Sequence, residues 1–246
     1  MAKGEVALVA GAAGGMGRAT VARLVRDGFK VAAMDINEAG LKEVVGRVGS
    51  GSRAYPCDQT DEARTREAVK LVENEMGPVG ALVTLTGWVG TTRFHEEDSA
   101  YWDKVIAINF KSILYITHAV LPGMQERKKG KIVYVSSDAG RVGTSGEAVY
   151  AGTKAGLIGY AKSLARENAR YTINVNVVCP GPTDTPLLQA EIEENPDLIQ
   201  RMVRLIPFRR IGQPEDMASA ISFFCSPDSD YITGQALSVS GGLTMV

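Results

Sequence analysis

Short apolar runs rich in β-branched residues alternate with longer amphipathic segments along most of the chain. The apolar runs predict seven strands, at Glu5–Ala10, Lys30–Asp35, Arg53–Cys57, Val79–Leu85, Lys131–Ser136, Thr172–Val178 and Gln235–Val239. The amphipathic segments predict helices over Arg18–Asp27, over Glu38–Val48 and from a Thr60 cap to about Met76. Because the strands are apolar almost without alternation, they are typical of a parallel sheet covered on both faces. The pattern therefore predicts an α/β fold: a single Rossmann-type, doubly wound parallel sheet of about seven strands with helices on both faces.

The chain shows no internal repeat, low-complexity tract or Pro/Gly/Ser-rich linker, so residues 1–246 are predicted to form one domain. The least regular part is residues 182–213, a polar helical stretch interrupted by Pro182, Pro186, Pro196 and Pro207. An insertion near the carboxyl ends of the strands is well placed to cover a ligand. We therefore predict a substrate lid at about residues 186–213.

Composition narrows the classes of partner. A net charge of −1 gives no reason to expect nucleic acid or an anionic membrane, and no apolar run approaches the length of a membrane span. Cys57, Cys179 and Cys225 lack CxxC spacing, and the N-terminus lacks a signal-peptide pattern, so we expect a cytoplasmic protein. His95 and His118 stand far apart without ligand spacing, so no metal site is expected.

A glycine-rich turn follows the first predicted strand. Gly11, Gly15 and Gly17 have the spacing G-x-x-x-G-x-G, with Met16 inside the turn. Such a turn lets the backbone approach a pyrophosphate and opens a helix whose first amides face that anion. A flexible turn without a ligand is the alternative, but the position between the first strand and the first helix favours a dinucleotide site.

Acidic residues end the second and third predicted strands. Asp35 lies 24 residues beyond Gly11, where a carboxylate can accept both adenosine ribose hydroxyls and repel a 2′-phosphate. No arginine or lysine follows it directly, so NAD is favoured over NADP, although Asp35 could also simply cap the turn at Asn37–Glu38. Asp58 is placed to touch the adenine edge, or else only leads into the next helix.

Tyr150 is the only one of eight tyrosines with a lysine four residues later, Lys154, and this spacing places both on one helical face. A nearby ammonium favours the phenolate and lowers its pKa from about 10, which suits acid/base catalysis. A surface pair without a role is the alternative.

Ser137, 13 residues upstream of Tyr150 at a strand end, can bind the substrate oxygen. Asn109 sits inside an apolar helix, where a water leading to Lys154 could satisfy its amide, or where it could mark a helix kink.

The turn after the sixth predicted strand begins with Pro180 and Gly181. Its backbone could hold a nicotinamide ring, with Thr183 or Thr185 binding the carboxamide or the phosphates.

Taken together, these residues resemble the classical short-chain dehydrogenase/reductase family over essentially the whole chain: Gly11, Gly15, Gly17, Asp35, Asn109, Ser137, Tyr150, Lys154, Pro180 and Gly181. The resemblance implies a nicotinamide-dependent oxidoreductase, usually tetrameric, in which Gly87 also contacts the cofactor. One departure stands out, because Thr84-Leu85-Thr86-Gly87 replaces the family's Asn-Asn-Ala-Gly. The first Asn ties neighbouring strands together, so its loss bears on local stability and adenine-side packing.

Within the family, segments 136–143, 146–150, 175–185 and 237–245 are similar to 2-hydroxycyclohexanecarboxyl-CoA and 2-[hydroxy(phenyl)methyl]succinyl-CoA dehydrogenases. That similarity implies NAD-dependent oxidation of a β-hydroxyacyl-CoA with a cyclic or aromatic acyl group. Arg204 and Arg209 beside the lid could meet CoA phosphates, Arg141 a second carboxylate, and Trp88 an aromatic ring. Each of these side chains could equally be structural, in ion pairs or at an interface.

Two rival functions remain open from the sequence. The first is an NADPH-dependent 3-oxoacyl thioester reductase of lipid synthesis, against which Asp35 argues. The second is a non-catalytic partner subunit of a heteromeric dehydrogenase, suggested by the altered Thr84-Leu85-Thr86. The intact set of Asn109, Ser137, Tyr150 and Lys154 argues against it. The assembly is accordingly expected to be a homotetramer, or a heterotetramer with a paralogous subunit.

Overall fold

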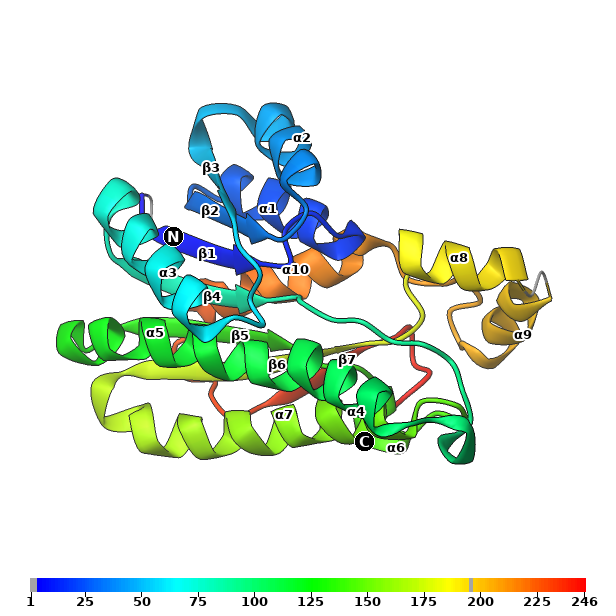
Figure 1. Cartoon of the computed structure of the whole chain (residues 1–246). Helices are drawn as coiled ribbons and strands as arrows, with labels where there is room; N and C mark the ends of the chain where they lie inside the picture. The colour runs from blue at the N-terminus through cyan, green and yellow to red at the C-terminus, as the bar shows by residue number, and fades with distance from the viewer. Residues whose placement is uncertain (1–3, 195–196) are drawn as a thin grey trace.

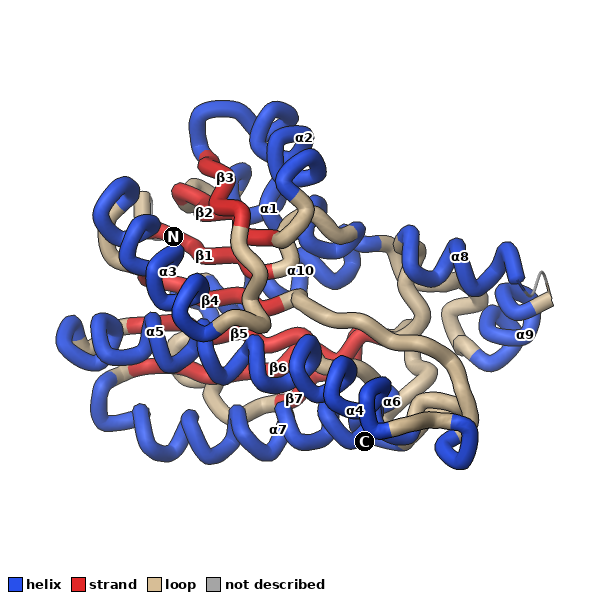
Figure 2. Tube along the Cα trace, in the orientation of Figure 1, coloured by secondary structure: helices blue, strands red, loops and turns tan. Residues whose placement is uncertain are grey.

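The computed structural model describes residues 4–194 and 197–246, and within them seven strands form one parallel sheet in the order β3-β2-β1-β4-β5-β6-β7 (Figure 2). The strands are β1 (Val6–Ala10), β2 (Lys30–Asp35), β3 (Ser52–Pro56), β4 (Val79–Thr84), β5 (Gly130–Val135), β6 (Ile173–Pro180) and β7 (Ala236–Val239). Each predicted strand is present with its ends shifted by no more than two residues. The predicted α/β doubly wound fold is therefore confirmed.

Helices cover both faces of this sheet (Figure 1). One face carries α1 (Gly15–Arg26), α2 (Glu38–Val48) and α10 (Pro214–Cys225). The other carries α3 (Glu62–Met76), α5 (Ser112–Arg127) and α7 (Ala148–Asn168).

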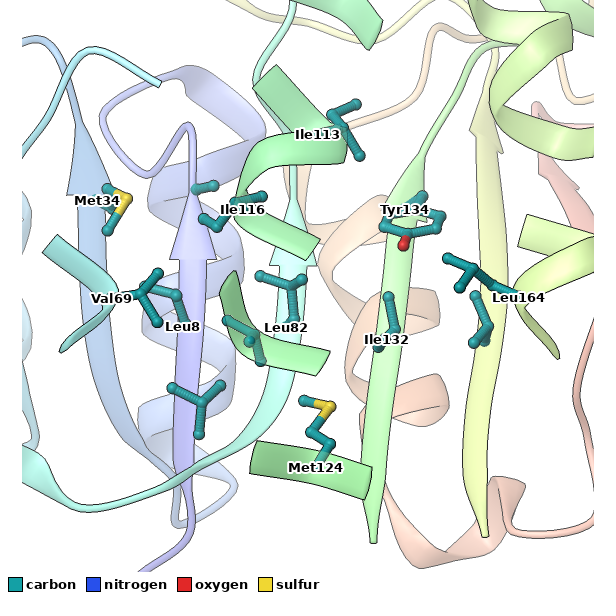
Figure 3. Close-up of a cluster of buried hydrophobic side chains, with 14 of the residues drawn as sticks. Leu8, Met34, Val69, Leu82, Ile113, Ile116, Met124, Ile132, Tyr134 and Leu164 are labelled. Carbon is teal, nitrogen blue, oxygen red and sulfur yellow. The ribbon is translucent and has the colours of Figure 1, made fainter. Parts of the chain in front are cut away.

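Alternate residues of the strands point into two separate cores. In β1, Leu8 joins the cluster beneath α3, α5 and α7, whereas Ala7 and Val9 join the cluster beneath α1, α2 and α10. Figure 3 shows Leu8 in the first of these clusters, opposite Ile116 and Val69 of the covering helices. Since both faces of the strand are buried, every residue of β1 is apolar, which explains the unalternated pattern in the sequence.

A long helical stretch runs from Ser99 to Arg127, and it comprises α4 (Ser99–Ile106), a π-helical turn (Ala107–Lys111) and α5. By length and composition alone this stretch of 29 residues could cross a membrane, with a mean hydropathy of 1.4 over its most apolar window. Its apolar residues Ile113, Ile116, Val120 and Met124 are buried against the sheet, as in the core helix of a globular domain. Sequence inspection missed its length because polar residues interrupt the apolar run.

Two helix boundaries differ from the prediction, and α10 was not predicted. Helix α1 begins at Gly15 rather than Arg18, since the last glycines of the turn already belong to its first turn. Helix α3 is capped by Asp61 and not by Thr60: the Asp61 carboxylate accepts the Arg64 amide at 3.1 Å. Helix α10 begins at Pro214, and Gln213 and Asp216 form a capping box at its N-terminus.

The segment predicted as a lid projects beyond the carboxyl ends of the strands (Figure 1). It contains α8 (Pro186–Glu194) and α9 (Leu198–Leu205), with residues 195–196 outside the described part. A bridge between Thr183 and Gly212 closes its base, and Leu188, Ile206 and Ile211 form a small core of their own within it. The segment is thus a compact excursion with its own packing, and its closure over a ligand stays a prediction.

Two helical glycines provide a matched test of how tightly the first turn of α1 is packed. A Cβ atom on Gly17 would lie 2.1 Å from the Gly11 carbonyl oxygen, whereas one on Gly46 in α2 would meet nothing within 4 Å. We expect Gly17→Ala to lower the free energy of unfolding by about 1–3 kcal/mol through overpacking. Gly46→Ala should leave it unchanged or raise it by up to about 1 kcal/mol through helix propensity. Urea unfolding of both variants measures this, and equal effects would refute the tight turn.

Candidate active site

The direction of strand addition reverses between β1 and β4, whose carboxyl ends lie side by side. Gly11 leaves β1 with a φ of 79°, and a Cβ atom there would lie 2.6 Å from the amide nitrogen of Thr86. Only glycine fits this backbone conformation and this close approach. The ligand site of an open α/β sheet forms at such a reversal point.

The remaining glycines shape the entrance to α1. Gly14 is the N-cap residue, and within the described part of the chain no side-chain hydrogen bond caps the first turn. A Cβ atom on Gly15 would lie 3.0 Å from Cγ2 of Thr185, so the turn packs against the segment that follows β6. The cradle is therefore bare backbone with helix amides at its base, an arrangement that suits a pyrophosphate.

A cavity of about 370 Å³ opens beside this cradle, and Gly11, Gly14, Asp35 and Asp58 line it. The Asp35 carboxylate accepts hydrogen bonds from the Ala13 amide at 3.0 Å and the Asn37 amide at 2.9 Å. These two bonds fix its position at the rim. Asp35 therefore both supports the turn at Asn37, as the alternative interpretation held, and presents a carboxylate to the cavity.

The Asp58 carboxylate faces its own loop, since one oxygen accepts both the amide and the hydroxyl of Thr60. Beside it, the buried Gln59 accepts a short hydrogen bond from the Thr86 hydroxyl. This contact ties the segment after β3 to the segment after β4. It supplies a link between neighbouring strands where the family's Asn is replaced, although the buried hydroxyl oxygen of Thr84 has no hydrogen-bond partner among the described residues.

Ser137 and Tyr150 line a second cavity of about 440 Å³ at the carboxyl ends of β5 and β6. Ser137 follows β5, and its hydroxyl accepts the Ala139 amide at 3.1 Å, which fixes the oxygen at the start of α6 (Ala139–Val142). Tyr150 stands in the first turn of α7. The structure therefore brings together two residues 13 positions apart in the sequence, as predicted.

Lys154 is buried one turn further along α7, with 3% of its surface exposed. Its Nζ donates to the Val135 carbonyl oxygen at 3.2 Å and lies 5.5 Å from the centre of the Tyr150 ring. Burial lowers the pKa of Lys154 to about 8, because the charged ammonium loses most of its hydration. A lysine at this depth is not a surface pair for Tyr150, so the alternative interpretation is wrong.

Asn109 lies in the π-helical turn between α4 and α5 and is fully buried. Its amide is satisfied by protein: Oδ1 accepts the Trp88 amide at 3.1 Å, and Nδ2 donates to the carbonyl oxygens of Trp88 and Val105. The helix distortion we considered is therefore present, and the side chain fixes the backbone after Gly87. Lys154 Nζ lies close by, 3.5 Å from where a Gly87 Cβ would stand, so Asn109, Gly87 and Lys154 form one cluster.

The segment after β6 closes the second cavity from the other side. Pro180, Gly181, Thr183 and Thr185 all line it, together with Met16 of the glycine turn. The Thr183 hydroxyl donates to the Gly181 carbonyl oxygen at 2.9 Å. Met16 follows Gly15 directly, and a Cβ atom on Gly15 would lie 3.0 Å from Cγ2 of Thr185, so the glycine turn borders the Ser137–Tyr150 cavity.

The proposed substrate residues do not gather at the cavity. Arg141 donates to the Ala236 carbonyl oxygen at 2.9 Å and to the Ser238 hydroxyl at 3.0 Å, which anchors α6 to β7. Arg209 donates to the Arg204 carbonyl oxygen, and both residues lie exposed after or in α9. None of the three is among the described residues that line the Ser137–Tyr150 cavity.

Trp88 is also displaced from the expected place, since it lines the cavity beside Asp35 rather than the one with Tyr150. Its ring packs edge-on against Tyr101 at 5.6 Å, and the ammonium of Lys104 lies 3.7 Å from its centre. It is therefore part of the wall formed with α4.

Several cavity residues escaped the sequence analysis. Asp138 directly follows Ser137 and is 5% exposed, and Glu147 precedes α7. Leu243 and Thr244 arrive from the C-terminus after Gly241 and Gly242, which both have positive φ. The glycine pair was the available signal, because a turn there directs the chain end back toward the site.

Residues 11–244 match the family model described as Enoyl-(Acyl carrier protein) reductase. The chain is 35% identical to the 3-oxoacyl-[acyl-carrier-protein] reductase FabG of Vibrio cholerae, over 99% of both chains. It is 38% identical to the acetoacetyl-CoA reductase of Synechocystis, over 96% of this chain and 95% of that protein. The structure of a Brucella melitensis 3-ketoacyl-(acyl-carrier-protein) reductase complexed with NADH superposes with a TM-score of 0.94, at 28% identity over both whole chains.

The chain belongs to the classical short-chain dehydrogenase/reductase family. It is an oxidoreductase of hydroxyl and keto groups that uses a nicotinamide cofactor. The residues present fit such a cofactor, because the cradle at Gly11, Gly15 and Gly17 leaves no room for Cβ atoms and presents free amides. Asp35 and the segment after Pro180 stand at its two ends.

Tyr150 carries the first prediction about the chemistry. Tyr150→Phe removes the phenolic hydroxyl, the group expected to exchange a proton with the substrate, and leaves the ring in place. We therefore expect the turnover rate to fall at least a hundredfold. Nucleotide affinity, measured by fluorescence titration, should change less than threefold. Turnover within a few-fold of the wild-type rate would sink the assignment of Tyr150.

The depth of Lys154 carries a prediction about stability. With a pKa of about 8 in the folded chain and 10.5 in the unfolded chain, the protonated lysine destabilises the fold below pH 8, by about 3 kcal/mol. That penalty disappears as the pH rises from about 8 to 10.5. We therefore expect nucleotide-free Lys154→Met to exceed the wild type in free energy of unfolding at pH 7 by about 1–3 kcal/mol, and the difference to vanish near pH 10.5. Urea unfolding at both pH values tests this; a less stable variant at pH 7 would contradict it.

Proposed function

We propose that this chain oxidises the secondary alcohol of a β-hydroxyacyl thioester to a ketone, with NAD as the hydride acceptor. The observation that carries the proposal is that the glycine turn borders the cavity of Ser137 and Tyr150. Met16 and Thr185 connect the glycine cradle to the cavity of Ser137 and Tyr150, so a dinucleotide in the cradle would end beside the substrate oxygen.

The protein's own residues handle the proton. Tyr150 as phenolate would accept the hydroxyl proton of the substrate. A nicotinamide held between the glycine turn and the segment after Pro180 would supply the acceptor for the hydride of the carbinol carbon. The Ser137 hydroxyl donates to the oxygen that becomes the carbonyl, and its position is fixed by the Ala139 amide. The Lys154 ammonium, held against Val135 and little screened by water, stabilises the phenolate. In the reverse direction Tyr150 returns the proton to the ketone oxygen.

Two neighbouring side chains support NAD as the cofactor. Asp35 offers a carboxylate at the cavity where the adenosine ribose would lie, and Ile36, 70% exposed, follows it without a positive charge. A 2′-phosphate would meet like charge there, and the described residues that line the cavity include no lysine or arginine. The Brucella relative was crystallised with NADH.

The thioester rests on the relatives, whose names specify 3-oxoacyl-[acyl-carrier-protein] and acetoacetyl-CoA. We favour CoA as the carrier, with the exposed Arg204 and Arg209 near its phosphates at the rim of the lid. The likeness of segments 136–143 and 175–185 to alicyclic and aromatic acyl-CoA dehydrogenases supports a cyclic or aromatic acyl group.

The reductase of lipid synthesis is the second candidate, favoured by the names of the curated relatives. It shares the reacting groups and differs in cofactor and direction. A non-catalytic subunit is disfavoured because Ser137, Tyr150 and Lys154 are assembled in one chain. We propose a homotetramer or a heterotetramer with a paralogue, and hydride transfer by the purified chain alone would exclude the non-catalytic alternative.

A panel of β-hydroxyacyl-CoA esters with linear, cyclic and aryl acyl groups tests the proposed reaction. With the purified chain and NAD, we expect NADH absorbance to rise with at least one ester, and fastest with a cyclic or aryl group. Activity confined to NADPH and 3-oxoacyl-[acyl-carrier-protein] would instead establish the second candidate.

The charge of Asp35 makes a quantitative prediction about nucleotide choice. We expect wild-type Kd for NADH to be at least tenfold lower than for NADPH, a difference of about 1.4 kcal/mol or more. Asp35→Asn keeps an oxygen for the Ala13 or Asn37 amide and removes the charge, so it should narrow the ratio severalfold. Calorimetric titration measures both, and a wild-type preference for NADPH would refute the choice of NAD.

A further inference from the structure

The cavity of Ser137 and Tyr150 has an unusual balance of charge. Among the described residues that line it, the charged ones are Asp138 and Glu147, both acidic. No lysine, arginine or histidine is among those described lining residues. An anionic group entering the cavity would therefore find like charge and no cation on its walls.

The basic residues considered as ligands above do not line this cavity. Arg141 is turned toward β7, where it donates to Ala236 and Ser238. Lys154 lies beneath Tyr150, on the side of Val135 and Gly87, and does not line this cavity. Arg204 and Arg209 stand exposed on the outer part of the lid.

Asp138, the residue after Ser137, lines the cavity and has one carboxylate oxygen with no hydrogen-bond partner among the described residues. Its Oδ1 accepts the Ser238 hydroxyl at 2.6 Å, whereas Oδ2 is buried without a partner among the described residues. Oδ2 lies 3.7 Å from where a Cβ atom of Gly181 would stand, next to another lining residue. A buried carboxylate with an unsatisfied oxygen opposes a second carboxylate and favours a neutral neighbour or a hydrogen-bond donor.

The remaining wall of the cavity is largely apolar, formed by Val89, Val142, Leu187, Leu188, Met202 and Leu243. Val142 and Leu187 are 59% and 47% exposed, so they offer apolar surface that a ligand can cover. A carboxylate placed against this wall would lose hydration and gain no hydrogen bond in return.

We propose that this cavity accepts only β-hydroxyacyl thioesters whose acyl group is uncharged, and that Asp138 and Glu147 reject acyl groups that carry a second carboxylate. The inference rests on the proposed function and narrows its substrate class. It excludes a succinyl-type substrate, which the sequence had allowed through Arg141. The thioester carrier, with its own phosphates, remains outside the cavity.

Three six-carbon substrates test this selection: 3-hydroxyhexanoyl-CoA, 3-hydroxyadipyl-CoA, and the methyl ester of the latter. They share a chain length and differ in terminal charge and polarity. We expect wild-type kcat/KM with NAD to be at least 30-fold lower for the free carboxylate than for its methyl ester. The ester should stay within about fivefold of the hexanoyl substrate.

Charge-neutralising variants assign the effect to the two acids. Asp138→Asn and Glu147→Gln should each lower, at least threefold, the ratio of kcat/KM for the methyl ester to kcat/KM for the free carboxylate. Asp184→Asn is the matched control, because Asp184 lies between two lining residues while its carboxylate accepts from Gln189 outside the cavity. In this control variant the ratio should stay at the wild-type value.

The possible results of these experiments distinguish the inference from the proposed function. Equal kcat/KM for carboxylate and ester in the wild type overturns the inference while leaving the proposed function standing. Discrimination that neither Asp138→Asn nor Glu147→Gln reduces overturns the assignment to these acids. Absence of turnover with these three thioesters and with the cyclic and aryl esters of the panel would overturn the proposed function, and this inference with it. Turnover of a cyclic or aryl ester but of none of these three would overturn this inference alone, because charge would then not decide which acyl groups are accepted.

Discussion

The burial of a lysine ammonium beneath Tyr150 is the constraint on which the rest of the site depends. Lys154 reaches its position because α7 packs directly on β6 and because Gly140 has no side chain: a Cβ atom there would lie 2.7 Å from the Lys154 carbonyl carbon. Its ammonium donates to one backbone oxygen, in a place where desolvation lowers its pKa to about 8. The rest of the fold therefore offsets the cost of an unfavourable charge, and we propose that this charge makes the Tyr150 phenol useful as a base near neutral pH.

The surroundings of Lys154 are organised to the same end. Asn109 fixes the Trp88 backbone and thereby Gly87, where a Cβ atom would lie 3.5 Å from the Lys154 ammonium. The π-helical turn that carries Asn109 is a local defect in a long helix, and such turns recur at functional sites. Asn109 and Lys154 are thus held by hydrogen bonds to backbone atoms, and none of the ion pairs among the described residues involves Lys154.

Most of the fold was predictable because its causes are local in the sequence. β1 is apolar on both faces, and Gly11 must adopt a positive φ, so both leave a clear mark. The relation of Ser137, Tyr150 and Lys154 was also predictable, since a strand end and one helical turn set their spacing. Asp138 and the C-terminal residues Leu243 and Thr244 were not, because their approach depends on how β7 and the last turn pack.

The contacts of Arg141 could not be predicted from the sequence. Arg141 lies four residues from Ser137, close enough in sequence to be taken for a substrate ligand. In the structure α6 turns its guanidinium toward Ser238, which in turn donates to Asp138. Which way a side chain points from a four-residue helix is decided by tertiary partners, and those partners lie nearly a hundred residues away. The cavity is consequently acidic and apolar where the sequence suggested a basic one.

We propose that the Lys154 ammonium makes Tyr150 a base near neutral pH. The most direct measurement is the pH dependence of single-turnover hydride transfer to NAD, in the wild type and in Lys154→Met, with the fastest ester. We expect the wild-type rate to rise with pH and reach half its maximum well below pH ~10, the ordinary value for a phenol. In Lys154→Met that midpoint should move up by more than one pH unit. The same midpoint in both proteins would contradict the account.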